Sequence, residues 1–265
     1  MKQSLSSHGP DARRNHILQL LQEQGECSVE ALAARFAVSS MTIRRDLQIL
    51  KDGGRIMRTH GGATPTSRIS FEFRYLQRAQ VQRAAKTAIA SKAVELIADG
   101  ESVLLDSGTT TLAIAEQLRY RRNLTVVTAS LPIASTLYGC EGISLLLMGG
   151  YLRHDEPDLT GVVTETNLEM IRPDVAFTGA DAIDEQGNLY QASPDLASIL
   201  SRIDQPVGRI YVVADHTKMG RTSLIRMRNL REWSGLITNS GIAPEFARKL
   251  AQAGGQVIIV DDQSS

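Results

Sequence analysis

The chain has 265 residues, a formal net charge of zero, 42% hydrophobic residues and 22% charged residues. This length suits one small and one larger domain, and no apolar run is long enough to span a membrane. The polar start is not that of a signal peptide, and Cys27 and Cys140 fit no metal spacing and are expected to be reduced. The sequence therefore predicts a cytoplasmic protein that needs no metal and no cofactor.

The neutral total hides an uneven distribution of charge. Residues 1–68 hold ten Lys or Arg against six Asp or Glu, whereas residues 69–265 hold 19 against 23. A basic head on an acidic body is expected when only one domain meets nucleic-acid phosphates.

Three helices and a wing are predicted in residues 1–63. Ser28 and Ser39 are predicted N-caps of the second and third helices, and residues 37–39 have the length of a helix-turn-helix corner. Residues 55–60 alternate weakly, as a short hairpin closed by Gly61 and Gly62 would. The apolar positions at helical spacing are Ile17, Leu20 and Leu21 in the first helix, Val29, Leu32, Ala33 and Phe36 in the second, and Ile43, Leu47 and Leu50 in the third.

The third helix is the best candidate for contact with DNA. If its apolar residues face inward, a period of 3.6 turns Met41, Arg44, Arg45 and Gln48 outward. Arginine at the N-terminal end of such a helix can pair with guanine or with phosphate in a major groove. The alternative is the solvated basic face of a helical bundle.

Residues 64–78 are predicted to be a linker that leads into a domain of residues 79–265. Helical patterns cover 72–78 and 80–98, and short β-branched apolar runs then alternate with helices. Such runs predict a mainly parallel sheet of βα units whose strands are buried on both faces. The runs are Val103–Leu105, Leu124–Val127, Ile143–Met148, Val175–Phe177, Ile210–Ala214, Leu236–Thr238 and Val257–Val260.

Polar loops follow several of these runs. Residues 106–111 (DSGTTT) open a helix, so their hydroxyls and free N–H groups can hold an anion; the alternative is an ordinary capped loop. Residues 179–184 (GADAID) place two acids three positions apart, which can hold sugar hydroxyls, do acid–base chemistry or form an Asx-type turn. Thr128–Ser130, Gly149–Gly150 and residues 214–218 (ADHTK) are expected on the same rim.

The stretch VSSMTIRRDLQILKDGGRIMRTHGGA resembles the signature of the DeoR family of bacterial transcription regulators. The resemblance implies that residues of the third helix and of the wing contact an operator in double-stranded DNA. Arg44 or Arg45 would contact base edges, and the other residues would contact mainly phosphates. The residues implied are Ser39, Ser40, Thr42, Arg44 and Arg45 from the helix and Arg58 and His60 from the wing.

The motifs DSGTTT, VVTASL, GGYLR, GADAID and ADHTKMGR resemble, in the same order, the effector domain of that family, which is similar to ribose-5-phosphate isomerase. The resemblance implies a sugar phosphate whose phosphate lies at residues 107–111, with Asp181 and Asp184 at its hydroxyls. The effector residues implied are Asp106, Ser107, Gly108, Thr109, Thr110, Thr111, Ser130, Gly150, Gly179, Asp181, Asp184 and Lys218.

The resulting hypothesis is a regulator without enzymatic activity, a dimer or tetramer that represses a carbohydrate operon and leaves its operator when a phosphorylated sugar binds. One segment departs from the family. Where many members have N-E-E-E-A-x-x-K, residues 193–200 read SPDLASIL, which places Leu196 and Leu200 at the expected Glu and Lys. This predicts a less polar pocket wall. A sugar-phosphate isomerase, an architectural DNA-binding protein and an activator are the alternatives.

Overall fold

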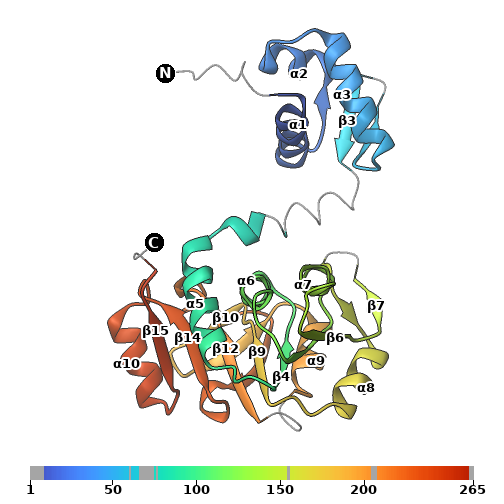
Figure 1. Cartoon of the computed structure of the whole chain (residues 1–265). Helices are drawn as coiled ribbons and strands as arrows, with labels where there is room; N and C mark the ends of the chain where they lie inside the picture. The colour runs from blue at the N-terminus through green and yellow to red at the C-terminus, as the bar shows by residue number, and fades with distance from the viewer. Residues whose placement is uncertain are drawn as a thin grey trace. The chain divides into compact units, whose positions relative to one another are not determined.

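The computed structural model describes residues 9–59, 61–65, 75, 77–153, 156–203 and 208–262. The chain divides into two compact units, Met1–Gln77 and Arg78–Ser265 (Figure 1). Most of the predicted linker, residues 64–78, lies outside the described residues. Within the described part of the chain, no helix is both long enough and apolar enough to cross a membrane.

The first unit contains the three predicted helices. They are α1 (Pro10–Gln24), α2 (Val29–Phe36) and α3 (Ser40–Asp52). Each predicted apolar stripe packs into one core, and Ile17, Leu21, Ile43 and Leu47 are fully buried there.

Two serines begin the second and third helices, as predicted. The Ser28 Oγ accepts a hydrogen bond from the Ala31 N–H at 3.1 Å, and the Ser39 Oγ accepts one from the Thr42 N–H at 3.2 Å. Ala37 adopts a left-handed conformation (φ 51°) that ends α2 and turns the chain toward α3. Local sequence therefore sets the helix-turn-helix corner.

The wing is a small antiparallel sheet in the order β1-β3-β2. A hairpin was predicted within residues 55–60, but the structure forms it from β2 (Ile56–Arg58) and β3 (Gly62–Pro65), so its second strand includes Gly62 and extends into the predicted linker. The strand β1 (Cys27–Ser28) was not predicted. A Cβ at Gly62 would lie 2.0 Å from the Cys27 carbonyl oxygen, so the approach of β3 to β1 requires glycine.

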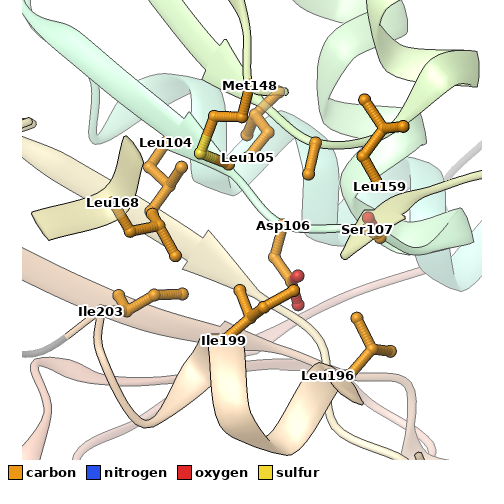
Figure 2. Close-up of a pocket in the computed structure, with 11 residues that line it drawn as sticks. Leu104, Leu105, Asp106, Ser107, Met148, Leu159, Leu168, Leu196, Ile199 and Ile203 are labelled. Atoms are coloured by element: carbon orange, nitrogen blue, oxygen red, sulfur yellow. The ribbon is translucent and has the colours of Figure 1, made fainter. Parts of the chain in front are cut away.

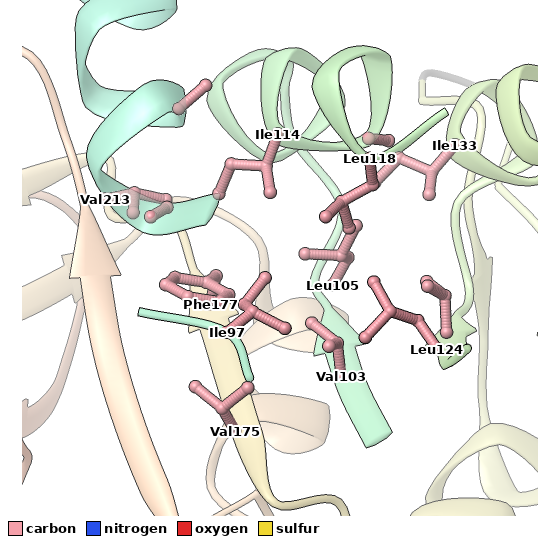
Figure 3. Close-up of a cluster of buried hydrophobic side chains, with 14 of the residues drawn as sticks. Ile97, Val103, Leu105, Ile114, Leu118, Leu124, Ile133, Val175, Phe177 and Val213 are labelled. Atoms are coloured by element: carbon pink, nitrogen blue, oxygen red, sulfur yellow. The ribbon is translucent and has the colours of Figure 1, made fainter. Parts of the chain in front are cut away.

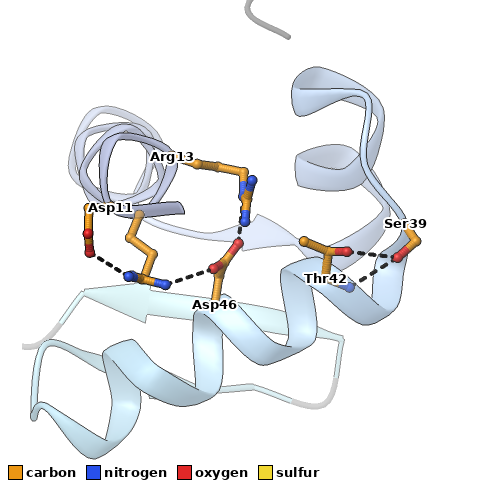
Figure 4. A network of polar contacts seen from close by, with 6 residues as sticks. Asp11, Arg13, Ser39, Thr42 and Asp46 are labelled. Atoms are coloured by element: carbon orange, nitrogen blue, oxygen red, sulfur yellow. Dashed lines mark hydrogen bonds and ion pairs between the residues drawn. The ribbon is translucent and has the colours of Figure 1, made fainter. Parts of the chain in front are cut away.

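A buried acid joins α1 to α3 (Figure 4). Asp46, on the otherwise apolar face of α3, accepts a hydrogen bond from the Arg13 Nε at 2.6 Å and one from the Arg14 Nη1 at 3.3 Å. The Asp46 side chain is 4% exposed, so this is an internal ion pair rather than a surface one. The guanidinium groups of Arg13 and Arg14 therefore bind Asp46 and stabilise the packing of α1 against α3.

All seven predicted runs form one parallel sheet in the second unit, which confirms the predicted α/β fold. Its strand order is β15-β14-β12-β9-β4-β5-β6. The strands are β4 (Ser102–Leu105), β5 (Leu124–Thr128), β6 (Ile143–Leu147), β9 (Val175–Thr178), β12 (Arg209–Val213), β14 (Gly235–Asn239) and β15 (Val257–Val260).

Helices cover both faces of this sheet. Side chains of α5 (Arg83–Glu95), α6 (Thr109–Leu118) and α7 (Leu131–Leu137) pack on one face (Figure 3). Those of α8 (Val162–Met170) and α9 (Pro194–Leu200) pack on the other face, as do those of α10 (Pro244–Gln252). In β4, Val103 and Leu105 belong to the first core and Leu104 to the second, because successive side chains point to opposite faces.

The prediction that every strand is buried on both faces is wrong at the sheet edges. Leu146 and Leu147 in β6 are each 44% exposed, and Ile259 in β15 is 50% exposed. An edge strand has a neighbour on one side only, so less of its surface is covered. Apolar runs reveal a parallel sheet but not which strands lie at its edges.

Several short elements were not predicted, and one helix begins later than expected. Gln82 has a φ of 55°, which interrupts the predicted helix of residues 80–98 and places the start of α5 at Arg83. The short elements are β7 (Tyr151–Leu152), β8 (Leu159–Thr160), β10 (Ala182–Ile183), β11 (Asn188–Gln191), β13 (Ile225–Asn229) and the 3₁₀ helices η1 (His216–Lys218) and η2 (Leu230–Glu232).

The strand order reverses between β4 and β9. From β4 the chain adds β5 and β6 on one side, and it later adds β9, β12, β14 and β15 on the other. Helices leave the carboxyl ends of the two central strands in different directions, and ligands of open α/β sheets bind in the crevice that results. The end of β4 is Leu105 and that of β9 is Thr178, so residues 106–111 and 179–184 flank this point.

Replacing Asp46 with Ala is expected to destabilise the first unit by about 2 kcal/mol, because Arg13 and Arg14 lose a charged hydrogen-bond partner. Urea unfolding followed by far-UV circular dichroism measures this loss. The fluorescence transition of Trp233, the single tryptophan, reports on the second unit and should not move. Asp52→Ala removes an exposed acid from the same helix and is the matched control. Equal stability of the two variants would show that the buried ion pair is not needed.

Candidate DNA interface and effector site

One face of α3 is exposed and carries two cations. Met41, Arg44, Arg45 and Gln48 are exposed, as the helical period predicts. The opposite face is anchored by Ile43, Leu47 and Leu50 in the core, so the rotation of the helix is determined by packing. This face has the basic character that a major groove requires.

Two of the predicted DNA-contacting residues have local partners. The Ser39 and Thr42 hydroxyl oxygens are 2.9 Å apart and bond to each other, and the Ser39 hydroxyl also caps α3. Ser40 is exposed at the first position of the helix. Ser39 and Thr42 therefore help to begin α3, a role that the sequence had assigned to Ser39 alone.

In the wing, Arg58 is half-buried at the end of β2. His60 lies outside the described residues. Arg44 and Arg45 of α3 are exposed, whereas Arg13 and Arg14 bind Asp46.

Asp106 lies at the reversal of the sheet and joins its two halves. Its Oδ2 accepts a hydrogen bond from the Thr178 hydroxyl at 2.9 Å and a longer one of 3.4 Å from the Gly179 N–H. Burial raises the pKa of the Asp106 carboxyl to about 6, although the hydrogen bonds from Thr178 and Ser107 act in the opposite direction. The structure thus brings together the DSGTTT and GADAID motifs.

The helix α6 begins at Thr109, inside the DSGTTT motif. Thr109 and Thr110 are half-buried, whereas Thr111 is fully buried and its hydroxyl donates to the Gly108 carbonyl oxygen at 3.0 Å. The first-turn N–H groups of a helix are available to an anion. Ser107, Thr109 and Thr110 can therefore face a ligand, while Thr111 stabilises the turn.

The two acids of the GADAID motif differ in what they can bind. The exposed Asp181 uses its Oδ2 to accept the Ala192 N–H at 2.8 Å. Asp184 accepts four hydrogen bonds from the chain, so the structure gives it the turn-forming role stated above as the alternative. Its donors are the Gln186 and Asn188 N–H groups, the Asn188 side-chain amide and the Tyr190 hydroxyl.

Two further predicted site residues have structural roles. The Ser130 side chain is 1% exposed, and its hydroxyl caps α7. Gly150 has a φ of 153°, and a Cβ there would lie 2.2 Å from the Thr164 Oγ1 and 2.7 Å from the Thr160 carbonyl oxygen. Glycine at position 150 is required by this packing, whether or not a ligand lies nearby.

A buried lysine, missed in the sequence, lies near Lys218 of η1. Burial lowers the pKa of the Lys86 ammonium to about 8, while the charge of Asp215 raises it and that of Lys218 lowers it. Lys86 also donates to the carbonyl oxygens of Arg78 and Val81. The only sign of this in the sequence is a lysine beside Ala85 on an apolar helical face.

An arginine of the GGYLR motif was also missed. Arg153 forms a two-pronged ion pair with Asp158, with distances of 2.5 Å and 2.9 Å, and its Nη1 donates to the Ser193 hydroxyl at 3.0 Å. Ser193 caps α9, so this pair fixes the start of that helix against β7 and β8. The motif itself could have identified Arg153, but Asp158 follows no motif.

An apolar wall closes one side of the Asp106 site (Figure 2). Leu196 and Ile199 of α9 line a pocket together with Asp106 and Ser107. Leu196 thus gives this cavity an apolar lining, and its role in an effector pocket stays a prediction. The prediction of a less polar wall is wrong at Leu200, which is buried in the core beneath α9 and does not line the pocket.

Comparison with known proteins agrees with both parts of this geometry. Residues 13–68 match the DeoR-like helix-turn-helix domain, and residues 81–240 match the DeoR C terminal sensor domain. The chain belongs to the DeoR family. Members of this family are transcriptional regulators, so this chain is a DNA-binding regulator and not an enzyme.

Relatives within the DeoR family match along nearly the whole chain. The glycerol-3-phosphate regulon repressor of Escherichia coli K12 is 33% identical over 229 residues, which cover 86% of this chain and 90% of that protein. The transcriptional repressor AccR of Agrobacterium fabrum is 33% identical over 230 residues, covering 86% and 89%. The regulator GlpR of Haloferax volcanii is 32% identical over 249 residues, covering 94% and 97%.

Among solved structures, D-ribose-5-phosphate isomerase in complex with phospho-erythronic acid matches the DeoR-family chain with a TM-score of 0.38. The identity is 20%, over 51% of this chain and 52% of that one. A similarity this distant says nothing about chemistry. Among the described residues, no group of three or more His, Cys, Asp and Glu is placed to hold a metal ion.

The raised pKa of Asp106 predicts a pH-dependent stability in this DeoR-family chain. An acid whose folded-state pKa is about 6 costs stability as the pH rises from about 4 to 6, because the unfolded chain releases the proton more readily. We expect the free energy of unfolding of Asp106→Asn, relative to that of the wild type, to rise by about 3 kcal/mol between pH 4 and pH 7. Urea unfolding followed by Trp233 fluorescence measures this difference.

Asp174→Asn is the control with the opposite sign. Hydrogen bonds from the Ser102 hydroxyl and N–H lower the pKa of Asp174. The free energy of unfolding of this variant, relative to that of the wild type, should therefore fall as the pH rises. Parallel pH profiles for Asp106→Asn and the wild type would contradict the prediction.

Proposed function

We propose that the chain represses a carbohydrate-metabolism operon in the cytoplasm and that a phosphorylated sugar, bound where the strand order reverses, lowers its affinity for the operator. The observation that carries this proposal is the hydrogen-bonded junction of Asp106 with Thr178 and Gly179, which joins the start of α6 to the loop that carries Asp181 at the carboxyl ends of β4 and β9. Two similar proteins are named repressors, one of them of the glycerol-3-phosphate regulon.

The DNA contacts proposed are those of α3 and the wing. Arg44 and Arg45 are exposed on the face opposite the core, where a guanidinium can bond to a guanine edge or a phosphate. Ser40 and Arg58 are assigned to the phosphate backbone of DNA, and Ser39 and Thr42 position the start of the helix. His60 stays in the proposal on sequence resemblance alone.

The effector contacts proposed follow the polarity of the site. The phosphate is assigned to the first turn of α6 at Ser107–Thr110, with the cation of Lys218 in support. Asp181 is assigned to a sugar hydroxyl because its side chain is exposed and one carboxylate oxygen, Oδ2, accepts the Ala192 N–H, which orients the group. Asp184 is left out, since its acceptor sites are filled by its own turn.

We also propose that the chain acts as a dimer or tetramer. A winged helix covers a short half-site, so specificity usually needs two heads. Supporting this, apolar side chains are exposed around the edge strand β6, at Leu146, Leu147, Tyr151, Leu152, Val162 and Val163. An edge strand beside an apolar surface is suited to a second copy of the same chain, because a two-fold axis places equivalent edges together.

Arg44→Ala or Arg45→Ala should weaken binding to a selected DNA site by about 1–3 kcal/mol when the side chain makes a bidentate base contact. The measurement is fluorescence anisotropy with sites selected from random DNA, at several salt concentrations, and affinity should fall steeply as salt rises. Lys51→Ala, near the C-terminal end of α3, is the control with a small effect. Sedimentation of the complex gives the number of chains per site. Unchanged affinity in both arginine variants would remove α3 from the groove.

A phosphorylated sugar should lower operator affinity in the wild type but not in the double variant Thr110→Ala, Asp181→Ala. The ligand shifts DNA binding only if it favours one state of the protein over another. Anisotropy titrations with a panel of pentose, hexose and triose phosphates test this, with inorganic phosphate as the ligand control. Glu141→Ala, an exposed acid before the amino end of β6, is the protein control.

The outcomes of that titration separate the alternatives. If no sugar phosphate changes wild-type binding, the inducer proposal fails and an architectural role for the second unit is favoured. If the double variant responds as the wild type does, the effector binds elsewhere.

A further inference from the structure

A large apolar side chain is exposed in the first turn of α3. Met41 is 74% exposed, although the same helix buries Ile43 and Leu47 completely. Met41 lies seven residues before Gln48, or nearly two full turns, so it shares the outward face with Arg44 and Arg45. It is therefore placed among the side chains proposed to face DNA, at the helix end that usually reaches the base edges.

Its neighbours cannot supply the same contact. The Ser39 and Thr42 hydroxyls bond to each other, and the Gln48 amide nitrogen donates to the Asp52 carboxylate at 2.7 Å. Arg44 and Arg45 can recognise guanine or phosphate, which are hydrogen-bond acceptors. Among these side chains, Met41 alone offers an unbranched apolar surface to the groove.

The major groove offers one apolar group for such a side chain. Thymine carries a C5-methyl group there, which no other base of unmodified DNA has, and apolar side chains contact it. We propose that Met41 is a specificity-determining residue that contacts the C5-methyl group of a thymine in each half-site. The proposal rests on the proposed placement of α3 in the major groove.

The test removes the methyl group from the DNA and the side chain from the protein separately. DNA sites are first selected from a random pool with the full-length wild-type chain, and each thymine is then replaced in turn by deoxyuridine, which lacks only the methyl group. Anisotropy should show a loss of about fourfold at one thymine per half-site, which corresponds to about 0.8 kcal/mol for one buried methyl group.

Three variants of Met41 complete the cycle, and all three residues are good helix formers, so α3 is retained. Met41→Ala and Met41→Gln should bind the thymine and deoxyuridine sites equally, whereas Met41→Leu should keep part of the discrimination. Ile49→Ala, which alters an exposed apolar side chain farther along α3, should behave as the wild type.

The proposal is overturned if the wild type tolerates every deoxyuridine, or if Met41→Ala discriminates as strongly as the wild type. Because Arg44→Ala and Arg45→Ala are measured on the same sites, the two proposals can fail separately. Loss of binding in the arginine variants without any methyl effect rejects Met41 alone. No effect of the arginine variants rejects the placement of α3 as well.

Discussion

The second unit depends on the reversal of strand order between β4 and β9. Strands on one side follow from β4 and strands on the other from β9, so the loops after these two strands meet although they are about 70 residues apart. Asp106 joins them by accepting hydrogen bonds from Thr178 and Gly179. A buried carboxyl is costly unless it is bonded, and its raised pKa records that cost at the place where a ligand is expected.

The side chains around the carboxyl ends of β4 and β9 differ in polarity. Cations lie near the loop after β12, with Lys86 and Lys218 around Asp215. On the opposite side, the Arg153–Asp158 pair positions α9, whose Leu196 makes the wall apolar. The apolar surface of the site therefore comes from α9, beside the buried charges of Arg153 and Asp158.

In the first unit, as in the second, a buried carboxylate joins two segments of the chain. Its core is small, and Asp46 joins α1 to α3 through Arg13 and Arg14, so the helix proposed to enter DNA is held by charge as well as by apolar packing. The same acid withdraws two arginines from the surface. Arg44 and Arg45 of α3 remain exposed, because Asp46 pairs with Arg13 and Arg14 instead.

Local sequence determined what local physics can decide. The 3.6-residue period gave the buried and exposed faces of α3, serine caps marked the starts of α2 and α3, and seven β-branched runs predicted the strands of the parallel sheet. Tertiary structure decided the rest. Which strands lie at an edge, and that Lys86 reaches the charges of Asp215 and Lys218, depend on contacts between segments distant in the chain. The four hydrogen bonds of Asp184 come from within six residues, so the local sequence offered this turn as an alternative and the structure chose it. The sequence pattern gives the period of a helix or strand, but it does not show which other elements pack against it.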